Sequence, residues 1–445
     1  MYPLRWLKKN KGITIVLALY LAVSFVLLMS WKDVVPLSGP DSPSYLDTAR
    51  YLRKAHFFSQ NGVTPEVFRT PGYPLFIWAI TKFTGSLLAI SSVQILLSTV
   101  ALLLMYQVVV RSTRSKLAGC IASGAMLFDF ITYWHSQTIL SETLFAFMLV
   151  LALYCLSHYI VENPNAIQKQ SKSKRYGWFL LFSLALNYAL FVRPILSYFN
   201  ALFCVAVLAL SLAKKMPWRH ALTFVLIFLL VYCGWSYRNY VHTQVFVYST
   251  VRDVNLLFWD AAFLVERVEN APASQLYYGV YRMEEIFWEQ MRNRPMDHLT
   301  EAQLAKLYAQ VGSAYIAEHF GQYIVQNISG AVRILVSPGG HLLDMVIPNA
   351  TISKLLSWLY AGFLLLVHGL YALGYALKFF KHKQKPSAID VFIFLLLGYH
   401  LAAGASLGFA RFRLPFFPLQ LVAIGLNWPL IAKALPRRFR SEVAG

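Results

Sequence analysis

Charged residues are scarce in this sequence, and acidic residues are the scarcest of them. Asp, Glu, Lys and Arg make up only 13% of the 445 residues, where about 25% is usual in soluble domains. Hydrophobic residues make up 58%, and the mean hydropathy is +0.52. A soluble protein of this length could not cover so much apolar surface, so most of the chain must be solvated by lipid. The composition therefore excludes a soluble globular protein and predicts an integral membrane protein.

Cysteines are few, and the common motifs of soluble enzymes are absent. The four cysteines all lie inside apolar segments, where they behave as small hydrophobic residues and form no secreted disulfide framework; they are Cys120, Cys155, Cys204 and Cys233. There is no Walker loop, dinucleotide fingerprint, HExxH or GxSxG motif. Because no nucleotide site is visible, any activated donor is expected to be carried by lipid.

Basic residues outnumber acidic ones by 40 to 20, but their distribution excludes nucleic acid as a partner. They gather in short clusters between apolar runs, which is typical of cytoplasmic loops of membrane proteins. The clusters are residues 5–11, 111–116, 169–175, 214–219, 378–385 and 437–440.

About ten apolar runs are long enough to be considered as transmembrane helices, since about 20 residues are needed to cross a bilayer. They are residues 13–30, 87–110, 117–133, 139–160, 178–192, 195–212, 221–237, 352–377, 389–407 and 414–434. Threading the chain through ten spans places every basic cluster on one side, which predicts cytoplasmic termini. The first run resembles a signal peptide, but its length favours an uncleaved span. Residues 71–83 are short and proline-rich, which predicts a re-entrant or interfacial piece.

The predicted fold class is thus an all-α integral membrane protein organised in three parts. A transmembrane core over residues 1–237 carries an external loop at 31–70, an extracytoplasmic helical segment covers 238–351, and transmembrane helices cover 352–445. Within the middle segment, Thr300 and Gln303 match a capping box that opens an amphipathic helix.

Four residues are candidates for acid–base chemistry on the external side. Asp41 starts the helix predicted after it and could serve as a general base for an acceptor hydroxyl; the alternative is a helix-capping carboxylate. Glu142 begins the fourth span on the same side. Asp129 and His135 lie nearby, and acids placed inside membranes are usually functional, although each could instead pair with an arginine or lysine.

Four arginines on this side break the positive-inside trend, namely Arg69, Arg193, Arg411 and Arg413. A guanidinium matches the geometry of a lipid phosphate or pyrophosphate, so these residues are predicted to bind one. The alternative is snorkelling to ordinary lipid headgroups.

In order along the chain, GPDSPSYLDTARYL, FRTPGYPLF, SETLF, VRP and FARFRLPFFPLQLVAIG resemble the glycosyltransferase C superfamily, which includes protein O-mannosyltransferases and lipid A aminoarabinose transferases. The resemblance implies an inverting transferase whose donor is a polyprenyl-phosphate sugar. It implies Asp41 as the catalytic acid of the first loop and Glu142 as the second acid. It also implies phosphate-binding arginines, which match Arg411 or Arg413, and Arg69, Tyr73 and Arg193 are further candidates for contacts to the carrier phosphate or sugar.

One departure concerns a metal. Some similar enzymes hold a divalent ion between their acids, but Ser42 follows Asp41 here and the next acid is Asp47, so a metal cofactor stays an open alternative. The acceptor, whether glycan, lipid or protein, is not visible in the sequence. A flippase or transporter of lipid-linked sugars and a non-catalytic sugar-binding relative are the competing functions. A bacterial plasma membrane is the expected location.

Overall fold

The computed structural model describes residues 9–33, 39–160, 172–271, 277–347 and 349–434, and the regular elements within these ranges are all helices. The predicted basic residues 5–8, 169–171 and 437–440 lie outside the described ranges. The all-α membrane fold predicted from composition is therefore confirmed.

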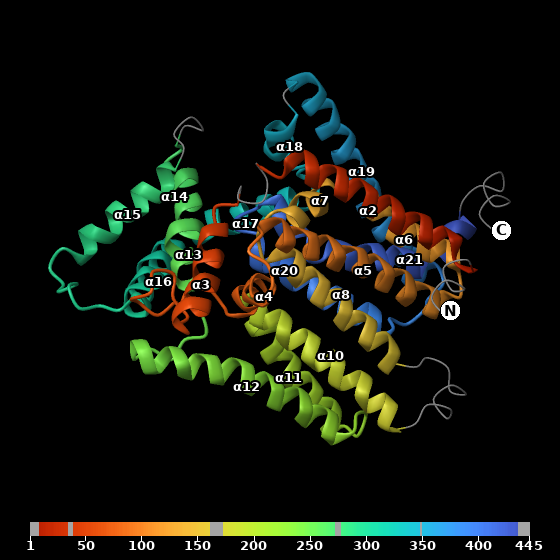
Figure 1. Ribbon diagram of the computed structural model, residues 1–445, viewed down its shortest axis with the longest axis horizontal. Helices are drawn as coiled ribbons and strands as arrows, with labels where there is room; N and C mark the ends of the chain where they lie inside the picture. The colour runs from red at the N-terminus through yellow and green to blue at the C-terminus, as the bar shows by residue number, and fades with distance from the viewer. Residues whose placement is uncertain (1–8, 34–38, 161–171, 272–276, 348, 435–445) are drawn as a thin grey trace.

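Among the described residues, seven helices are long and apolar enough to cross a membrane, and Figure 1 shows them packed as one bundle. They are α2 (Lys11–Trp31), α5 (Leu87–Thr113), α8 (Glu142–Tyr159), α10 (Lys172–Val192), α11 (Ser197–Leu212) with its short leading turn η2 (Pro194–Leu196), α12 (Trp218–Thr243), and α19 (Ala350–Ala376) continued by η4 (Leu377–Lys381).

The remaining apolar runs are helical but differ from straight spans. Residues 117–133, expected as one span, form α6 (Lys116–Gly124), η1 (Ala125–Phe128) and α7 (Phe130–Gln137), with a bend of 67° at Asp129. Asp129 has an extended backbone and its carboxylate caps α7, which explains the break. Counting this bent pair as one span gives eight.

Three apolar helices complete the membrane part. They are α4 (Gly72–Thr81), α20 (Ala388–Gly404) and α21 (Phe417–Ala434). α4 and α20 are short, and α4 occupies the stretch expected to be re-entrant or interfacial. α21 packs against α5, α6 and α19, and most of its side chains are buried, so it lies inside the bundle.

The segment between α12 and α19 folds into helices with a small hydrophobic core. Its elements are α13 (Val251–Asn255), η3 (Leu256–Ala261), α14 (Ala262–Val268), α15 (Tyr278–Met291), α16 (Glu301–Glu318), α17 (Phe320–Val336) and α18 (Gly340–Val346). Leu257, Leu264, Met283 and Phe287 are buried together there. Thr300 and Gln303 form both hydrogen bonds of the predicted capping box. In Figure 1, α13 to α16 lie beyond one end of the long helices, beside α3 (Ser42–Ala55).

The bundle has two chemically different ends. At one end, here called the basic end, Arg111 donates to the carbonyl of Ser157 near the C-terminus of α8, and Lys116 donates to the carbonyl of Lys9 before α2. α8 begins at the other end with Glu142, where the start of α3, directly after Asp41, also lies. We call this second end the first-loop end. Two of the predicted basic clusters, 5–11 and 111–116, thus meet at the end opposite Glu142.

Candidate functional site

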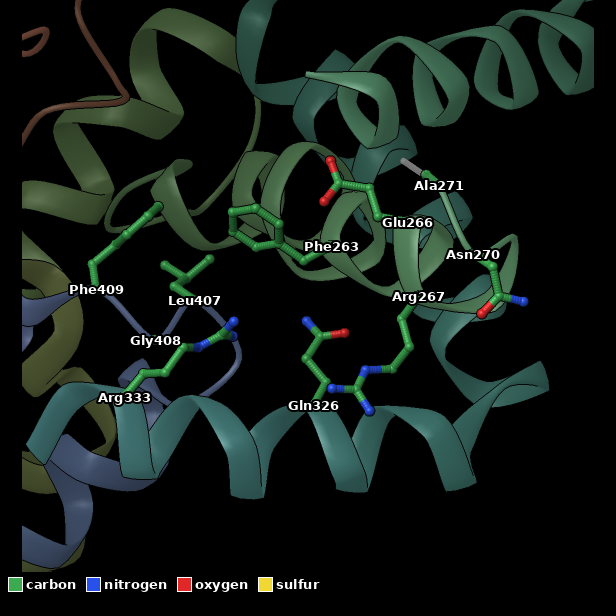
Figure 2. Close-up of a pocket in the computed structure, with 10 residues that line it drawn as sticks. All are labelled: Phe263, Glu266, Arg267, Asn270, Ala271, Gln326, Arg333, Leu407, Gly408 and Phe409. Carbon is green, nitrogen blue, oxygen red and sulfur yellow. The ribbon is translucent and has the colours of Figure 1, made fainter. Parts of the chain in front are cut away.

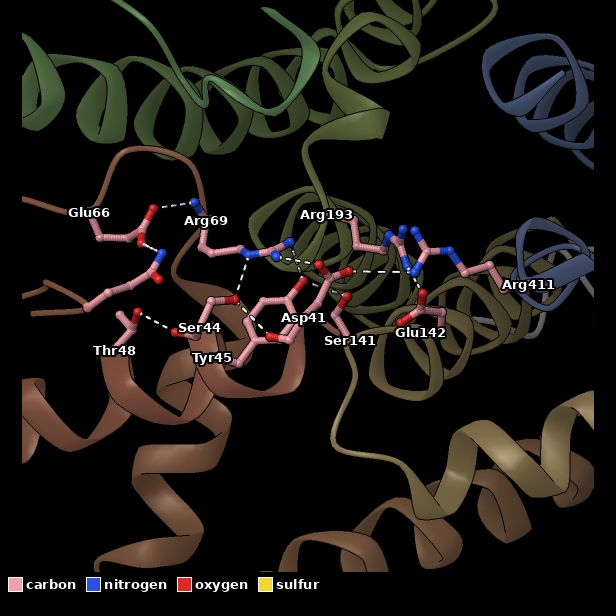
Figure 3. Close-up of polar contacts among 11 residues, drawn as sticks. Asp41, Ser44, Tyr45, Thr48, Glu66, Arg69, Ser141, Glu142, Arg193 and Arg411 are labelled. Atoms are coloured by element: carbon pink, nitrogen blue, oxygen red, sulfur yellow. Dashed lines mark hydrogen bonds and ion pairs between the residues drawn. The ribbon is translucent and has the colours of Figure 1, made fainter. Parts of the chain in front are cut away.

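Asp41 lies directly before α3, and its carboxylate contacts two arginines. Pro43 stands in the first turn of α3, yet the Asp41 side chain makes no capping hydrogen bond. Instead, Nη2 of Arg69 lies 2.6 Å from Oδ1, and Nη1 of Arg411 lies 3.5 Å from Oδ2 (Figure 3). The helix-capping alternative therefore does not describe Asp41, because both of its oxygens face guanidinium groups.

Arg69 is held in place from several directions. Its Nε donates to Oγ of Ser44 over 3.0 Å, and its guanidinium lies 4.6 Å from the ring centre of Tyr45. Oε1 of Glu66 accepts hydrogen bonds from the backbone amide of Arg69, over 2.7 Å, and from that of Phe68. Burial acts to lower the pKa of Arg69, but Tyr45 and Asp41 outweigh it and raise the pKa, so the side chain stays charged.

A second pair, Arg193 and Glu142, lies beside the first. Pro194 disfavours helix at the preceding residue, so α10 ends and Arg193 takes an extended backbone with φ of −138°. Its Nη1 lies 2.8 Å from Oε1 of Glu142, whose side chain is only 3% exposed. Burial acts to lower the pKa of Arg193, but Glu142 is the main influence that raises it above its ordinary value.

Contacts between elements hold the two pairs together. The hydroxyl of Tyr45 lies 3.2 Å from Oγ of Ser141, the residue before α8. Oγ1 of Thr70 donates to the carbonyl of Val192 over 2.9 Å, which ties the Arg69 segment to the end of α10. Gly72 is needed at this junction, since a Cβ there would lie 2.6 Å from the backbone of Phe191.

The cluster formed by Asp41, Arg69, Glu142, Arg193 and Arg411 carries three guanidiniums and two carboxylates. Arg411 also acts electrostatically on Glu142, so the five charges form one group (Figure 3). One positive charge is left over, and the cluster is partly open, with the Asp41 side chain 31% exposed and that of Arg411 28%. Such a group favours an anionic ligand that brings oxygen acceptors.

The same residues do not fit a metal site. Both oxygens of Asp41 face arginines and Glu142 is paired with Arg193, which leaves no carboxylate directed at a shared position. In the described part of the chain, no three His, Cys, Asp or Glu side chains are grouped so that they could hold an ion. Divalent cations such as Ca²⁺ and Mg²⁺ require several oxygen ligands directed at one position.

Arg413, which we expected beside Arg411, lies in a different environment. Its side chain is 1% exposed, and Nη1 donates to the carbonyls of Ile334, Leu335 and Ser337. Nη2 donates to the hydroxyl of Tyr360 over 3.2 Å. The turn η5 (Ala410–Arg413) is a 3₁₀ turn with about three residues per turn, so residues two apart face different sides. Arg411 faces Asp41, while Arg413 faces α17 and α19.

Asp129 belongs with Arg413 and not with the cluster. Tyr360 donates a hydrogen bond to its carboxylate, which also accepts from the backbone amide of Thr132 over 3.1 Å. Arg413, Tyr360 and Asp129 thus form a buried chain of hydrogen bonds that joins η5, α19 and α7. Asp129 therefore has hydrogen-bond partners within the protein, but it makes no direct pair with an arginine or lysine of the described residues, because Arg413 reaches it only through Tyr360.

The three remaining candidates, Tyr73, His135 and Asp47, lie outside the cluster. The hydroxyl of Tyr73 donates to Oε1 of Gln94 over 2.6 Å, and its ring meets that of Tyr45 edge-on at 4.9 Å, so Tyr73 supports Tyr45 from behind. His135 is buried and interacts electrostatically with Glu142. Asp47 faces away on α3, where it pairs with Arg50 at 2.7 Å.

Sequence reasoning missed Glu66, Ser44 and Gln94. Glu66 stands three residues before Arg69, a spacing at which a carboxylate reaches backbone amides ahead of it, and this could have been recognised. Gln94 accepts from Tyr73 and donates to the carbonyls of Ser136 and Thr138, but it is one of several polar residues within a long apolar run. No local pattern distinguishes it.

Comparison with known proteins finds a family model that matches part of the chain and several solved structures of similar fold. Residues 73–247 match the family model of dolichyl-phosphate-mannose-protein mannosyltransferases, a range that includes Glu142 and Arg193. A comparison with curated protein sequences finds no match. Among solved structures, the Archaeoglobus fulgidus oligosaccharyltransferase in its apo form is 12% identical, with a TM-score of 0.54, and the match covers 98% of this chain and 52% of that one.

Two further structures are similar. The same archaeal enzyme tethered to an acceptor peptide is 13% identical, with a TM-score of 0.52 and coverage of 99% and 54% of the two chains. The chain thus spans about half the length of this oligosaccharyltransferase. ArnT from Cupriavidus metallidurans bound to undecaprenyl phosphate is 15% identical over 94% of this chain and 80% of that one, with a lower TM-score of 0.43. The mannosyltransferase family model thus matches one part of this chain, and the described helices share the fold of this archaeal oligosaccharyltransferase.

Proposed function

We propose that this protein transfers a sugar from a polyprenyl-phosphate carrier to an acceptor hydroxyl, with inversion at the anomeric carbon. The observation that supports this most directly is the convergence of Arg69, Arg193 and Arg411 on Asp41 and Glu142 at one end of the helix bundle. These residues come from four separate parts of the chain, and each is oriented by contacts with its neighbours.

The excess positive charge is the basis for a phosphate-linked donor. Of the two arginine contacts to Asp41, the one from Arg411 is the longer, at 3.5 Å. In addition, Nε of Arg411 is buried without a hydrogen-bond partner among the described residues. A donor phosphate would give that guanidinium the acceptors it lacks, because forked arginine donors match phosphate oxygens. Since the sequence offers no nucleotide-binding motif, the phosphate is expected on a lipid carrier.

Asp41 is the proposed base. When Arg411 turns to the phosphate, Oδ2 of Asp41 is freed to accept the proton of the acceptor hydroxyl. The acceptor oxygen then bonds to the anomeric carbon from the face opposite the phosphate. The bond from that carbon to the phosphate oxygen breaks, and the electron pair leaves with the polyprenyl phosphate. Arg193 and Arg411 stabilise the negative charge that develops on the leaving group.

Glu142 and Arg69 act by positioning in this proposal. Glu142 is buried against Arg193 at 2.8 Å, so it fixes the direction of a guanidinium that contacts the donor. Arg69 holds Oδ1 of Asp41 at 2.6 Å, which leaves Oδ2 as the oxygen that can take up a proton. The same two contacts explain why no metal ion is included in the mechanism.

We further propose that the cluster faces the extracytoplasmic side of a bacterial plasma membrane, with both termini in the cytoplasm. Basic residues of the short connections gather at the basic end, and the positive-inside rule places such residues in the cytoplasm. The acceptor in this proposal is a glycan, a lipid or a protein.

Purified protein in lipid vesicles, supplied with a radiolabelled polyprenyl-phosphate sugar and mixed candidate acceptors, tests the proposal. Labelled product at the expected anomeric configuration supports transfer. Movement of the labelled lipid across the bilayer without product would instead support a flippase or transporter. Retention of the lipid with neither product nor movement would support a non-catalytic binding protein.

A further inference from the structure

A cavity lies outside the charged cluster, between α14, α17 and the loop that leads to Arg411. Its volume is about 670 Å³, which falls within the range of about 300–1,000 Å³ that small-molecule pockets occupy. Phe263, Glu266, Arg267, Gln326, Arg333 and Phe409 are among its lining residues, and none of them belongs to the cluster (Figure 2).

Gln326 offers a buried hydrogen-bond acceptor to this cavity. The side chain is 2% exposed, and its Nε2 donates to the carbonyls of Asp260, over 3.2 Å, and Ser406, over 3.1 Å. These two bonds fix the amide, and Oε1 has no partner among the described residues. Figure 2 shows the amide pointing from α17 into the cavity. A buried acceptor oriented in this way is suited to a hydroxyl of a ligand.

Two guanidiniums flank Gln326 in the same cavity. Among the described residues, neither Arg267 nor Arg333 forms an ion pair, and Arg267 has only a 3.4 Å hydrogen bond to Oγ of Ser329. Arg333 lies against Gly408, where φ is +65° and a Cβ would be 2.7 Å from Nε of the arginine. Glu266 also lines the cavity, where its Oε1 accepts from the backbone amide of Gly279, so the lining carries one negative charge against two positive ones. The free donors favour an anionic group on the ligand.

Aromatic rings form the remaining wall and connect the cavity to the cluster. Phe263 and Phe409 meet edge-on at 5.9 Å, and Trp259 contacts Phe409 at 6.0 Å. The apolar face of a sugar ring can lie against such rings while its hydroxyls reach polar groups. The guanidinium of Arg411 lies 5.7 Å from the ring centre of Phe409, so the cavity adjoins the residue that faces Asp41.

We propose that this cavity binds an anionic saccharide, with its phosphate or carboxylate between Arg267 and Arg333 and a hydroxyl on Oε1 of Gln326. The role of this saccharide rests on the proposed function: it is the acceptor of the sugar, and Phe409 places it next to Asp41 and Arg411. The combination of unpaired guanidiniums, a fixed amide oxygen and an aromatic wall favours an acidic sugar over an acidic peptide.

The test is a titration of the purified full-length protein in detergent, followed by saturation-transfer NMR. The probes are glucose 1-phosphate, glucuronic acid, neutral maltose and a short acetylated peptide that contains one Asp. The two anionic sugars should bind about tenfold more tightly than maltose, and the double variant Arg267→Gln, Arg333→Gln should lose about tenfold in their affinity. Both arginines lie at the rim of an open cavity, so the variant is expected to fold.

A control variant separates this site from a general effect of removing positive charge. Arg292→Gln removes an exposed arginine from the same segment and should leave binding unchanged. Equal binding of maltose, binding of the acidic peptide alone, or full binding by the double variant would each overturn the inference. If the sugars bind as expected but no transfer is ever detected, the proposed function fails and the binding site stands. If transfer occurs but the double variant binds the anionic sugars as tightly as the wild type does, the proposed function stands and the proposed binding site is wrong.

Discussion

Arg411, near the C-terminal end of the chain, lies with its Nη1 3.5 Å from Oδ2 of Asp41 in the first loop. The two residues are brought together because α20 runs from the basic end to the first-loop end, where η5 begins. Lys378 pairs with Asp390 at the start of α20, and this 2.6 Å contact anchors the other end of the same helix. A helix bundle thus places an acid from one loop and a cation from another at a common rim.

Asp41→Asn should reduce sugar transfer by about 100-fold or more, because an amide cannot take up the acceptor proton. Asp47→Asn provides the matched control, since Asp47 lies on α3, the helix that follows Asp41, and pairs with Arg50. Initial rates of labelled product formation, normalised to protein recovered from membranes, measure the difference. Transfer by the Asp41 variant at a rate close to that of the wild type would remove Asp41 from the mechanism.

The proposed orientation predicts which end of the bundle a membrane-impermeant maleimide can reach in intact cells. In a background with the four native cysteines replaced by alanine, Val63→Cys should be labelled, because Val63 is 81% exposed in the loop between α3 and α4. Arg114→Cys, at the basic end after α5, should be labelled only after the cells are opened. The opposite pattern would place the cluster in the cytoplasm.

Arg411 and Arg413 should respond to substitution in different ways. Arg411→Gln is expected to lower transfer by about 100-fold through the loss of a donor to the developing charge, with little change in thermal stability, since the side chain is 28% exposed. Arg413→Gln should lower the free energy of unfolding by about 3 kcal/mol, because the carbonyls it serves are left unpaired in a buried site. Melting temperatures in detergent and transfer rates separate the two effects.

The positions of these arginines show what sequence can and cannot predict in this protein. Apolar runs and basic clusters are local properties, so the helices and the shared end of Asp41, Glu142 and Arg411 could be predicted. Which of Arg411 and Arg413 faces the cluster depends on the direction of a single turn, η5, and no periodicity encodes it.

The span count shows a second limit of sequence reasoning. Hydropathy marks the run that contains Asp129 as one continuous segment. The bend at Asp129 arises because that carboxylate caps a new helix and accepts from Tyr360, a residue far away in the chain. Partners that are distant in sequence therefore decided the geometry where local patterns were ambiguous.

Tyr73 was expected to contact substrate, and its place behind Tyr45 leads to a sharper prediction. Tyr73→Phe should cost about 1 kcal/mol of stability through the lost bond to Gln94, with transfer kinetics close to those of the wild type. Tyr45→Phe should instead slow transfer, because its hydroxyl contacts both Arg69 and Ser141. A raised KM in the Tyr73 variant, without a similar rise in the Tyr45 variant, would indicate that Tyr73 contacts the substrate directly.

Asp260, in the helical segment between α12 and α19, should make stability depend on pH. Burial raises its pKa from the ordinary 3.8 to about 6, although a hydrogen bond from Ser406 and the charge of Arg252 act in the opposite direction. Between these two values the folded protein holds the proton more tightly than the unfolded chain does. Stability should therefore fall as the pH rises through this window and level off above it.

Replacing Asp260 with asparagine removes the group that titrates. The variant should lose the decline between pH 4 and pH 6 and gain about 1–2 kcal/mol at pH 7, a value reduced from the full shift because the side chain is partly exposed. Asp297→Asn, an exposed position in the same segment, corrects for the general loss of one negative charge. Melting temperatures recorded from pH 4 to pH 8 should converge for wild type and the Asp260 variant at the acidic limit and separate towards neutrality. Curves that stay parallel throughout would mean that Asp260 is solvated in the folded protein.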